Sequence, residues 1–128
     1  LYGAEDKNNS ARLGYESLTA DTMHRMDLDA VVEKIRQRTK GRKVFLTFDI
    51  DFLDPAFAPG TGTPVPGGFS TWEALEIIRG LKELDIVGYD LVEVAPAFDG
   101  SGITSIAAAG IIQEFLAQIA WRKKSRKL

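Results

Sequence analysis

The apolar residues of the chain predict helices that alternate with strands. The first segment carries apolar residues at the three- and four-residue spacing of a helix face: Leu28, Val31, Val32 and Ile35. Asp27 is suited to cap the start of this helix, and Gly41 is suited to end it. The run 43–48 is apolar almost throughout and rich in β-branched and aromatic residues. It therefore predicts a strand of a parallel sheet that is covered on both faces.

Residues 70–121 repeat this order. Ser70 and Glu73 have the spacing of a capping box. The helix that they open carries five apolar residues: Ala74, Leu75, Ile77, Ile78 and Leu81. Residues 86–93 have the composition of a second strand, and a strongly apolar helix is expected from about 103 to 121. The first two dozen residues are polar and predict no regular element.

The alternation predicts an α/β fold in which helices cover a parallel sheet. Two strands make a thin core, however, and their apolar edges would be left unpaired. The chain also begins with Leu1 rather than with methionine. Because of both features, we expect the sheet to continue in residues outside this sequence.

A long loop separates the first strand from the helix that follows it. Between residues 49 and 69 the chain holds many residues that suit neither a helix nor a strand ladder: Pro55, Pro59, Gly60, Gly62, Pro64, Pro66, Gly67 and Gly68. Loops of this length inside compact domains are usually functional. The loop is therefore the first place to look for a site.

Composition narrows the chemistry that the chain can carry. The 128 residues are 45% hydrophobic with a formal net charge of -2, which is the balance of a folded globular domain. The absence of cysteine excludes disulfides, thiolate zinc sites and cysteine nucleophiles. His24 is the single histidine, so this sequence cannot form a multi-histidine metal site. We expect His24 to be a surface or loop residue.

Positive charge is concentrated at the end of the chain. Five basic residues stand among the last seven: Arg122, Lys123, Lys124, Arg126 and Lys127. We interpret 122–128 as a basic, solvated tail after a folded part that covers 1–121. The mild overall acidity favours neither nucleic acid nor membrane partners, and no apolar run is expected to reach the roughly 20 residues that span a bilayer. Without cysteine or a signal pattern, a cytoplasmic location is expected.

Carboxylates end both predicted strands. Asp49 and Asp51 close the first strand, and Glu93 closes the second. Ligands of parallel α/β proteins bind beyond the carboxyl ends of the strands, so these side chains are expected at one edge of the sheet. Alternate residues of a strand point the same way, and two converging carboxylates suit Mg²⁺ or Mn²⁺. A helix cap or a surface ion pair is the alternative for Glu93.

Two other interpretations of the aspartates are open. In the first, Asp49 caps the start of the loop, Asp51 and Asp54 form Asx turns before Pro55, and Asp99 is a turn residue. In the second, the strand that ends in Asp-x-Asp resembles the haloacid-dehalogenase phosphatases, whose first aspartate is a nucleophile. That family needs a downstream lysine and a further acidic pair at a later strand end, and its strand is not followed by a loop rich in proline and glycine.

The long loop is specific enough to indicate a family. Residues 47–64, TFDIDFLDPAFAPGTGTP, resemble a signature of the ureohydrolases, the family of arginase and agmatinase, and the agmatinase form in particular. The resemblance extends to the opening LYGAED, to the pair Gly67-Gly68 and to the segment VEVAP at 92–96 with Asp99. It therefore covers essentially the whole chain.

The resemblance implies a three-layer α/β/α domain on a parallel eight-stranded sheet, of which this chain is the C-terminal part. It implies hydrolysis of a guanidinium to urea and an amine, which for agmatine is putrescine, at a site with two Mn²⁺ ions. By motif position, Asp49 would bridge both ions and Asp51 would bind one. Glu93 would accept hydrogen bonds from the guanidinium, and Thr63 would help to position the substrate. The resemblance also implies a homo-oligomer.

The sequence departs from the family by what it lacks. The family's Gly-Gly-Asp-His and Asp-Ala-His-x-Asp segments and its proton-transfer histidine are absent, so no catalytic residue is assigned. We therefore expect the 128 residues to be inactive by themselves. The alternatives are a non-catalytic piece that folds against a missing half or a partner subunit, and a different guanidino substrate such as guanidinobutyrate or proclavaminate.

Overall fold

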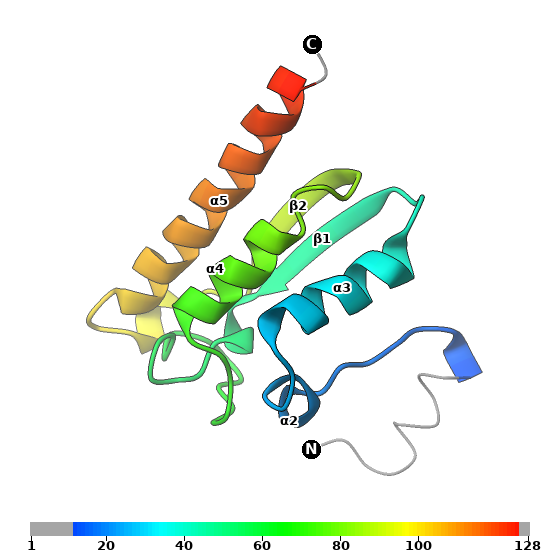
Figure 1. The fold of residues 1–128 in the computed structure, drawn as a ribbon. Helices are drawn as coiled ribbons and strands as arrows, with labels where there is room; N and C mark the ends of the chain where they lie inside the picture. Colours follow the sequence, from blue (N-terminus) through cyan, green and yellow to red (C-terminus); the bar gives the residue numbers. More distant parts are fainter. Residues whose placement is uncertain (1–11, 126–128) are drawn as a thin grey trace.

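The computed structural model describes residues 12–125 and has the order of elements that the sequence predicts (Figure 1). Its helices are α2 (Ala20–Met23), α3 (Leu28–Thr39), α4 (Thr71–Gly80) and α5 (Ile103–Ser125). Its strands are β1 (Val44–Asp49) and β2 (Ile86–Val92), and two single-turn 3-10 helices are η1 (Ile50–Phe52) and η2 (Pro96–Phe98). β1 and β2 pair in parallel and are connected through α4. The predicted α/β order is confirmed, while the opening LYGAED lies outside the described residues.

The predicted helix starts are present, with one difference. At α4 the capping box forms: Ser70 Oγ accepts from the Glu73 amide at 3.2 Å, and Glu73 Oε2 accepts from the Ser70 amide at 2.8 Å. The Ser70 hydroxyl, which donates to Glu73 Oε2 at 2.6 Å, and the Ser70 amide lower the pKa of the Glu73 carboxyl. Asp27 is the residue before α3, but its side chain makes no capping hydrogen bond. Gly41 follows α3 with a positive φ of 71°, a conformation that glycine adopts without strain.

The core lies between one face of the sheet and the helices. This face carries Leu46, Phe48, Tyr89 and Leu91, which pack with buried residues of α4 and α5. The Tyr89 ring stacks on Phe115 of α5 at a centroid distance of 4.6 Å. The Tyr89 hydroxyl donates to Gln118 Oε1 at 3.0 Å, and Gln118 Nε2 donates to the carbonyl of Ile78 in α4 at 2.7 Å. The Gln118 side chain thus connects α5 to both β2 and α4.

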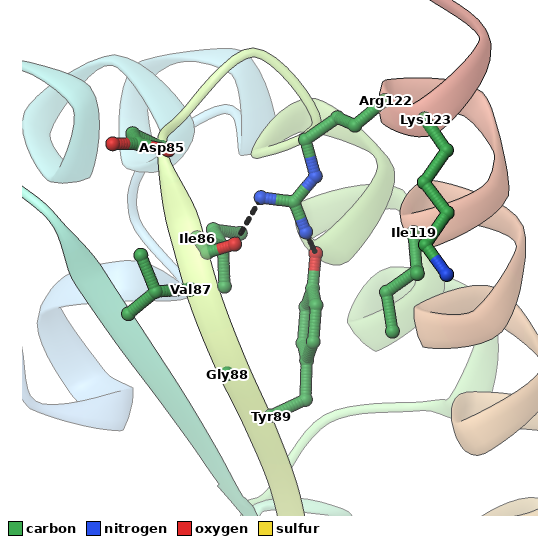
Figure 2. Close-up of a pocket in the computed structure, with 8 residues that line it drawn as sticks. All are labelled: Asp85, Ile86, Val87, Gly88, Tyr89, Ile119, Arg122 and Lys123. Carbon is green, nitrogen blue, oxygen red and sulfur yellow. Dashed lines mark hydrogen bonds between the residues drawn. The ribbon is translucent and has the colours of Figure 1, made fainter. Parts of the chain in front are cut away.

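Arg122 fastens the last part of α5 to β2 (Figure 2). Its guanidinium donates to the carbonyl of Ile86 and, at 2.7 Å, to the Tyr89 hydroxyl. The hollow beside it, about 400 Å³, is lined by the start of β2 and by Ile119, Arg122 and Lys123. It therefore lies at the opposite end of β2 from Glu93.

The predicted boundary between the domain and the basic tail at residue 121 stays a prediction. In the structure, α5 continues past this position through Ser125.

The opposite face of the sheet is open in the described part of the chain. Phe45 and Val87 are 60% and 61% exposed, and Thr47, between half-buried Leu46 and buried Phe48, is exposed as well. The expectation of a first strand covered on both faces is therefore wrong for residues 12–125, because every helix that contacts the core packs on the other face. The apolar composition of the strand predicts that another element covers this face of the sheet, and that element is not among the described residues.

α5 corrects the expectation about membrane-spanning segments. By length and composition alone, its residues Ile103–Ser125 make one helix that is long and apolar enough to cross a bilayer. Core helices of α/β domains meet the same criterion, and one face of α5 packs here on α4 and β2. Its remaining face carries exposed apolar residues, among them Ile106 and Leu116. A helix that is apolar all round is expected to be covered on both sides.

One short helix was missed in the polar N-terminal segment. α2 has only four residues, too few to show a helical period, and Thr19 caps it by accepting from the Thr22 amide at 3.3 Å. Met23, its last residue, is buried against Phe69 and Ile77. The segment before α3 is therefore attached to the core rather than wholly irregular.

Candidate functional site

The predicted site residues meet at the carboxyl ends of the two strands. Asp49 is the last residue of β1, and it pairs in register with Val92 of β2. Glu93 follows Val92 directly, and Asp51 lies in η1, the single turn after β1. Parallel strands end at the same edge of their sheet, so the three carboxylates share this edge, as the sequence predicted.

The long loop brings Thr63 to the same place. Thr63 Oγ1 donates to Asp51 Oδ2 at 2.8 Å, and Asp49 Oδ1 accepts from the Asp51 amide at 3.1 Å. Gly62 lies so close to Glu93 that a Cβ at this position would be 4.0 Å from Glu93 Oε2. The loop therefore spans the site from the Asp51 side to the Glu93 side.

The electrostatics of the site disfavour negative charge. Burial raises the pKa of the Asp49 carboxyl above its ordinary value, the Asp51 amide opposes this rise, and the carboxylates of Asp51 and Glu93 add to it. Neighbouring like charges repel unless a cation or a proton lies between them. The arrangement thus favours a bound cation over three free carboxylates.

The donor atoms fit part of a metal site. Asp49 and Asp51 offer the hard oxygen ligands that Mn²⁺ and Mg²⁺ take. Within residues 12–125 no group of three or more histidine, cysteine, aspartate or glutamate side chains is placed to hold an ion. Two carboxylates are too few for two metal ions, so the remaining ligands of a dinuclear site would have to come from other residues. The roles of Asp49, Asp51, Glu93 and Thr63 stay predictions.

Asp54 holds the two ends of the loop together. Its Oδ1 accepts from the Ala56 amide at 2.9 Å, which is the Asx turn that the alternative interpretation predicted. Its Oδ2 accepts from the amides of Gly67 and Gly68 at 2.8 and 3.3 Å. These bonds, that from Ala56 foremost, lower the pKa of the Asp54 carboxyl. Asp54 is therefore a structural residue of the loop.

Asp99 is confirmed as a turn residue. It is buried, and its carboxylate accepts from the Ser101 hydroxyl and from the amides of Ser101, Gly102 and Thr104, at 2.6 to 3.1 Å. The Ser101 hydroxyl and the Thr104 amide make the largest contributions that hold the pKa of Asp99 well below its ordinary range. Thr104 in turn accepts from the Gly60 amide at 2.8 Å, so this turn also fixes the middle of the long loop.

Three features of the site were not predicted. Glu93 has a positive φ of 67°, which is uncommon for a residue other than glycine and is a form of strain typical of functional sites. The Thr61 hydroxyl is buried and has no hydrogen-bond partner among the described residues. His24 is exposed, as expected, but it contacts the loop at Gly67 and Phe69. No local sequence pattern indicates these features, and the His24 contact with Gly67 joins segments 43 residues apart.

The chain belongs to the arginase family. The model of that family matches residues 2–117 of this chain, and this match replaces the haloacid-dehalogenase alternative. The chain is 52% identical over 108 residues to an agmatinase from Neisseria meningitidis serogroup C, a match that covers 84% of this chain and 35% of that protein. It is 45% identical over 115 residues to a guanidinobutyrase from Pseudomonas aeruginosa, covering 90% and 36%.

Solved structures agree with the arginase-like α/β fold. A hypothetical agmatinase from Burkholderia thailandensis matches with a TM-score of 0.88 and 45% identity, over 98% of this chain and 38% of that chain. Proclavaminate amidino hydrolase from Streptomyces clavuligerus matches with a TM-score of 0.84 and 41% identity, over 88% and 37%. The chain spans about 35% of the length of the first curated relatives that it matches, so the described fold is part of an arginase-like domain.

Proposed function

We propose that this chain is the C-terminal part of an agmatinase-like ureohydrolase, which hydrolyses agmatine to putrescine and urea. One observation carries the proposal: Asp49, Asp51, Thr63 and Glu93 lie together beyond the strand ends, in a chain about half identical to agmatinases. The family match sets the class of enzyme, and the arrangement of these residues supports the substrate chemistry.

In this proposal Asp49 and Asp51 hold part of a dinuclear Mn²⁺ site. Two such ions supply a water of lowered pKa as the nucleophile for the guanidinium carbon. Asp49 keeps its orientation through the Asp51 amide, and Asp51 keeps its orientation through the Thr63 hydroxyl. Burial first, and the neighbouring carboxylates after it, raise the pKa of the Asp49 carboxyl, and a bound cation would stabilise its ionised form against both effects.

Glu93 binds the substrate in this proposal. A guanidinium presents several N–H donors in one plane, and a carboxylate accepts them as charge-assisted hydrogen bonds. Glu93 is exposed at the end of β2, faces the loop at Gly62, and is held in a left-handed backbone conformation. That conformation turns the chain at the strand end, where the substrate would lie.

The remaining ligands would come from an upstream part of a longer protein. The open sheet face with Phe45 and Val87, and the exposed apolar face of α5, are surfaces that such a part would cover. The complete protein is proposed to be a cytoplasmic homo-oligomer that acts on a small guanidino compound and has neither nucleic acid nor membrane partners. Residues 1–121 are proposed to be the C-terminal part of the ureohydrolase domain, and residues 122–128 are proposed to be a basic tail.

The test compares the 128 residues with the full-length protein. Each is incubated with Mn²⁺ and agmatine, and urea release is measured. We expect turnover from the full-length protein and none from the 128 residues, because two aspartates do not complete the metal site. Clear turnover by the short chain would overturn the expected inactivity, and no turnover by the full-length protein on any guanidino compound would overturn the proposed class.

The choice of substrate has its own comparison. The relatives include a guanidinobutyrase and a proclavaminate amidino hydrolase, so the full-length protein is assayed with agmatine, guanidinobutyrate and proclavaminate in parallel. The proposal expects the highest kcat/KM with agmatine. A higher value with either other compound would keep the reaction and change the substrate.

A further inference from the structure

A column of stacked rings connects α2 to the site. The ring of His24 stacks on Phe69 at a centroid distance of 4.3 Å, and Phe69 stacks on Phe52 at 4.6 Å. Phe52 meets Phe48 edge to face at 5.5 Å. Phe52 follows Asp51 in the sequence, so the column begins on α2 and ends beside the predicted metal ligand.

His24 also makes a polar contact with the site loop. Its Nε2 lies 3.0 Å from the carbonyl oxygen of Gly67. A carbonyl only accepts, so the proton of this bond is on Nε2. The Gly67 amide donates to Asp54 at 2.8 Å, so the peptide groups on both sides of Gly67 are engaged in hydrogen bonds.

Thr63 lies between two anchors of the loop. At the first anchor, the amide of Gly60 donates to Thr104 Oγ1 at 2.8 Å and the carbonyl of Gly60 accepts from the Ala95 amide at 2.8 Å. The second anchor is Gly67, held by Asp54 and His24. Between them Thr63 reaches Asp51, and a cavity of about 190 Å³ lies between this part of the loop, Asp51 and α2. This cavity leaves the loop without packing contacts on the side of Asp51 and α2. The two anchors, Gly60 and Gly67, therefore set the distance between the loop and the site.

We propose that His24 is a positioning residue of the enzyme: it holds the second anchor of the loop and thereby keeps the Thr63 hydroxyl on Asp51. The expected effect on enzyme kinetics rests on the proposed function. The expected effect on the loop rests on the contacts of His24 alone. His24 touches neither the predicted metal ligands nor Thr63, and it acts through the Gly67 carbonyl and the Phe69 ring.

Three substitutions separate the two contacts. His24→Phe keeps the stacked ring and loses the donor, His24→Gln places an amide donor near the position of Nε2, and His24→Ala loses both. Arg25→Ala is the matched control, because Arg25 is the next residue, is also exposed, and its side chain pairs with Asp21 of α2 rather than with the loop. All four are made in the full-length protein.

The first readout is amide hydrogen exchange of residues 61–68, which needs no activity. We expect exchange about fivefold faster with His24→Phe, the factor of one neutral hydrogen bond, and faster still with His24→Ala. His24→Gln and Arg25→Ala should keep the unsubstituted rate. Unchanged exchange with both His24→Phe and His24→Ala would overturn the proposal whether or not the protein is a ureohydrolase.

The second readout is steady-state kinetics with the preferred guanidino substrate. We expect His24→Phe to raise KM about fivefold with kcat within twofold, and His24→Gln to restore KM. A general structural role would instead lower the melting temperature and reduce kcat and bound Mn²⁺ together, without rescue by glutamine; that result would overturn the positioning role. If the unsubstituted protein has no activity, the proposed function is wrong. The hydrogen-exchange result then tests the positioning role of His24 by itself.

Discussion

Four aspartates near the same end of the sheet form a structural pair, Asp54 and Asp99, and a functional pair, Asp49 and Asp51. Asp54 and Asp99 each accept hydrogen bonds from three backbone amides, and their pKa values are lowered. Asp49 accepts one backbone amide, and burial together with neighbouring carboxylates raises its pKa. Asp51 accepts the Thr63 hydroxyl. The structural pair stabilises the fold with its negative charge, whereas burial and neighbouring carboxylates oppose the negative charge of Asp49 in the functional pair.

This difference separates structure from function within one residue type. Groups whose environment disfavours their charge, beside specific charged partners at a strand end, are candidates for a functional site. Groups saturated by backbone donors hold turns. The alternative interpretation from the sequence was therefore correct for Asp54 and Asp99, and for the local bond of Asp49, but that bond does not account for the raised pKa of Asp49.

The largest expected effect comes from removing charge in the functional pair. Asp49→Asn keeps the Oδ1 that accepts the Asp51 amide and removes the negative charge that a metal ion needs. In the full-length protein we expect kcat/KM to fall by on the order of 10³-fold or more, because the metal-bound nucleophile is lost, and bound Mn²⁺ to fall in elemental analysis.

The matched variant in the structural pair is Asp54→Asn. It should keep the Mn²⁺ content of the full-length protein and lower its melting temperature, because a neutral amide oxygen is a weaker acceptor for the amides of Gly67 and Gly68. The division into two pairs is wrong if Asp54→Asn loses Mn²⁺ as completely as Asp49→Asn does.

The second effect concerns the backbone that Asp54 holds. A Cβ at Gly68 would lie 2.5 Å from the Asp54 amide nitrogen and 2.7 Å from the Leu53 carbonyl carbon. Gly68→Ala is therefore expected to destabilise the protein by about 1–3 kcal/mol, the usual cost of overpacking, as measured by urea denaturation. Gly100→Ala is the control, since nothing lies within 4 Å of a Cβ there. Equal stability of the two variants would mean that the loop end moves without cost.

Local patterns were enough to predict the two strands, the three long helices, the Ser70–Glu73 capping box and the strand-end carboxylates. Each of these depends on residues a few positions apart, so spacing alone carries it. The left-handed Glu93, the bond from Arg122 to Ile86 and the contact of His24 with Gly67 were not predicted. The two contacts join segments 36 and 43 residues apart, and no periodicity or motif encodes them. Their place at the strand ends indicated Asp49, Asp51 and Glu93 as candidates, whereas their individual roles and the choice of Thr63 came from the family resemblance.

A third, smaller effect is the pH dependence that Asp99 confers. Its pKa is lowered from the ordinary value of 3.8, so its ionised form stabilises the fold fully above that pH, and the contribution is lost as the pH falls further. Asp99→Asn should lower the melting temperature at neutral pH, and the gap to the unsubstituted protein should narrow below about pH 4. Melting curves between pH 3 and 7 measure it; a gap independent of pH would show that the Asp99 charge does not stabilise the turn.

The smallest expected effect tests how firmly the loop is coupled to the functional pair. Thr63→Val removes the hydroxyl that donates to Asp51 Oδ2 and keeps the shape of the side chain, whereas Thr63→Ser keeps the hydroxyl. Because Thr63 is exposed, water can partly replace the lost donor, and we expect KM to rise only about fivefold with valine and less than twofold with serine. Steady-state kinetics on the full-length protein separate these values. An equal loss with both variants would assign the effect to side-chain shape, and the hydroxyl would then not be what links the loop to Asp51.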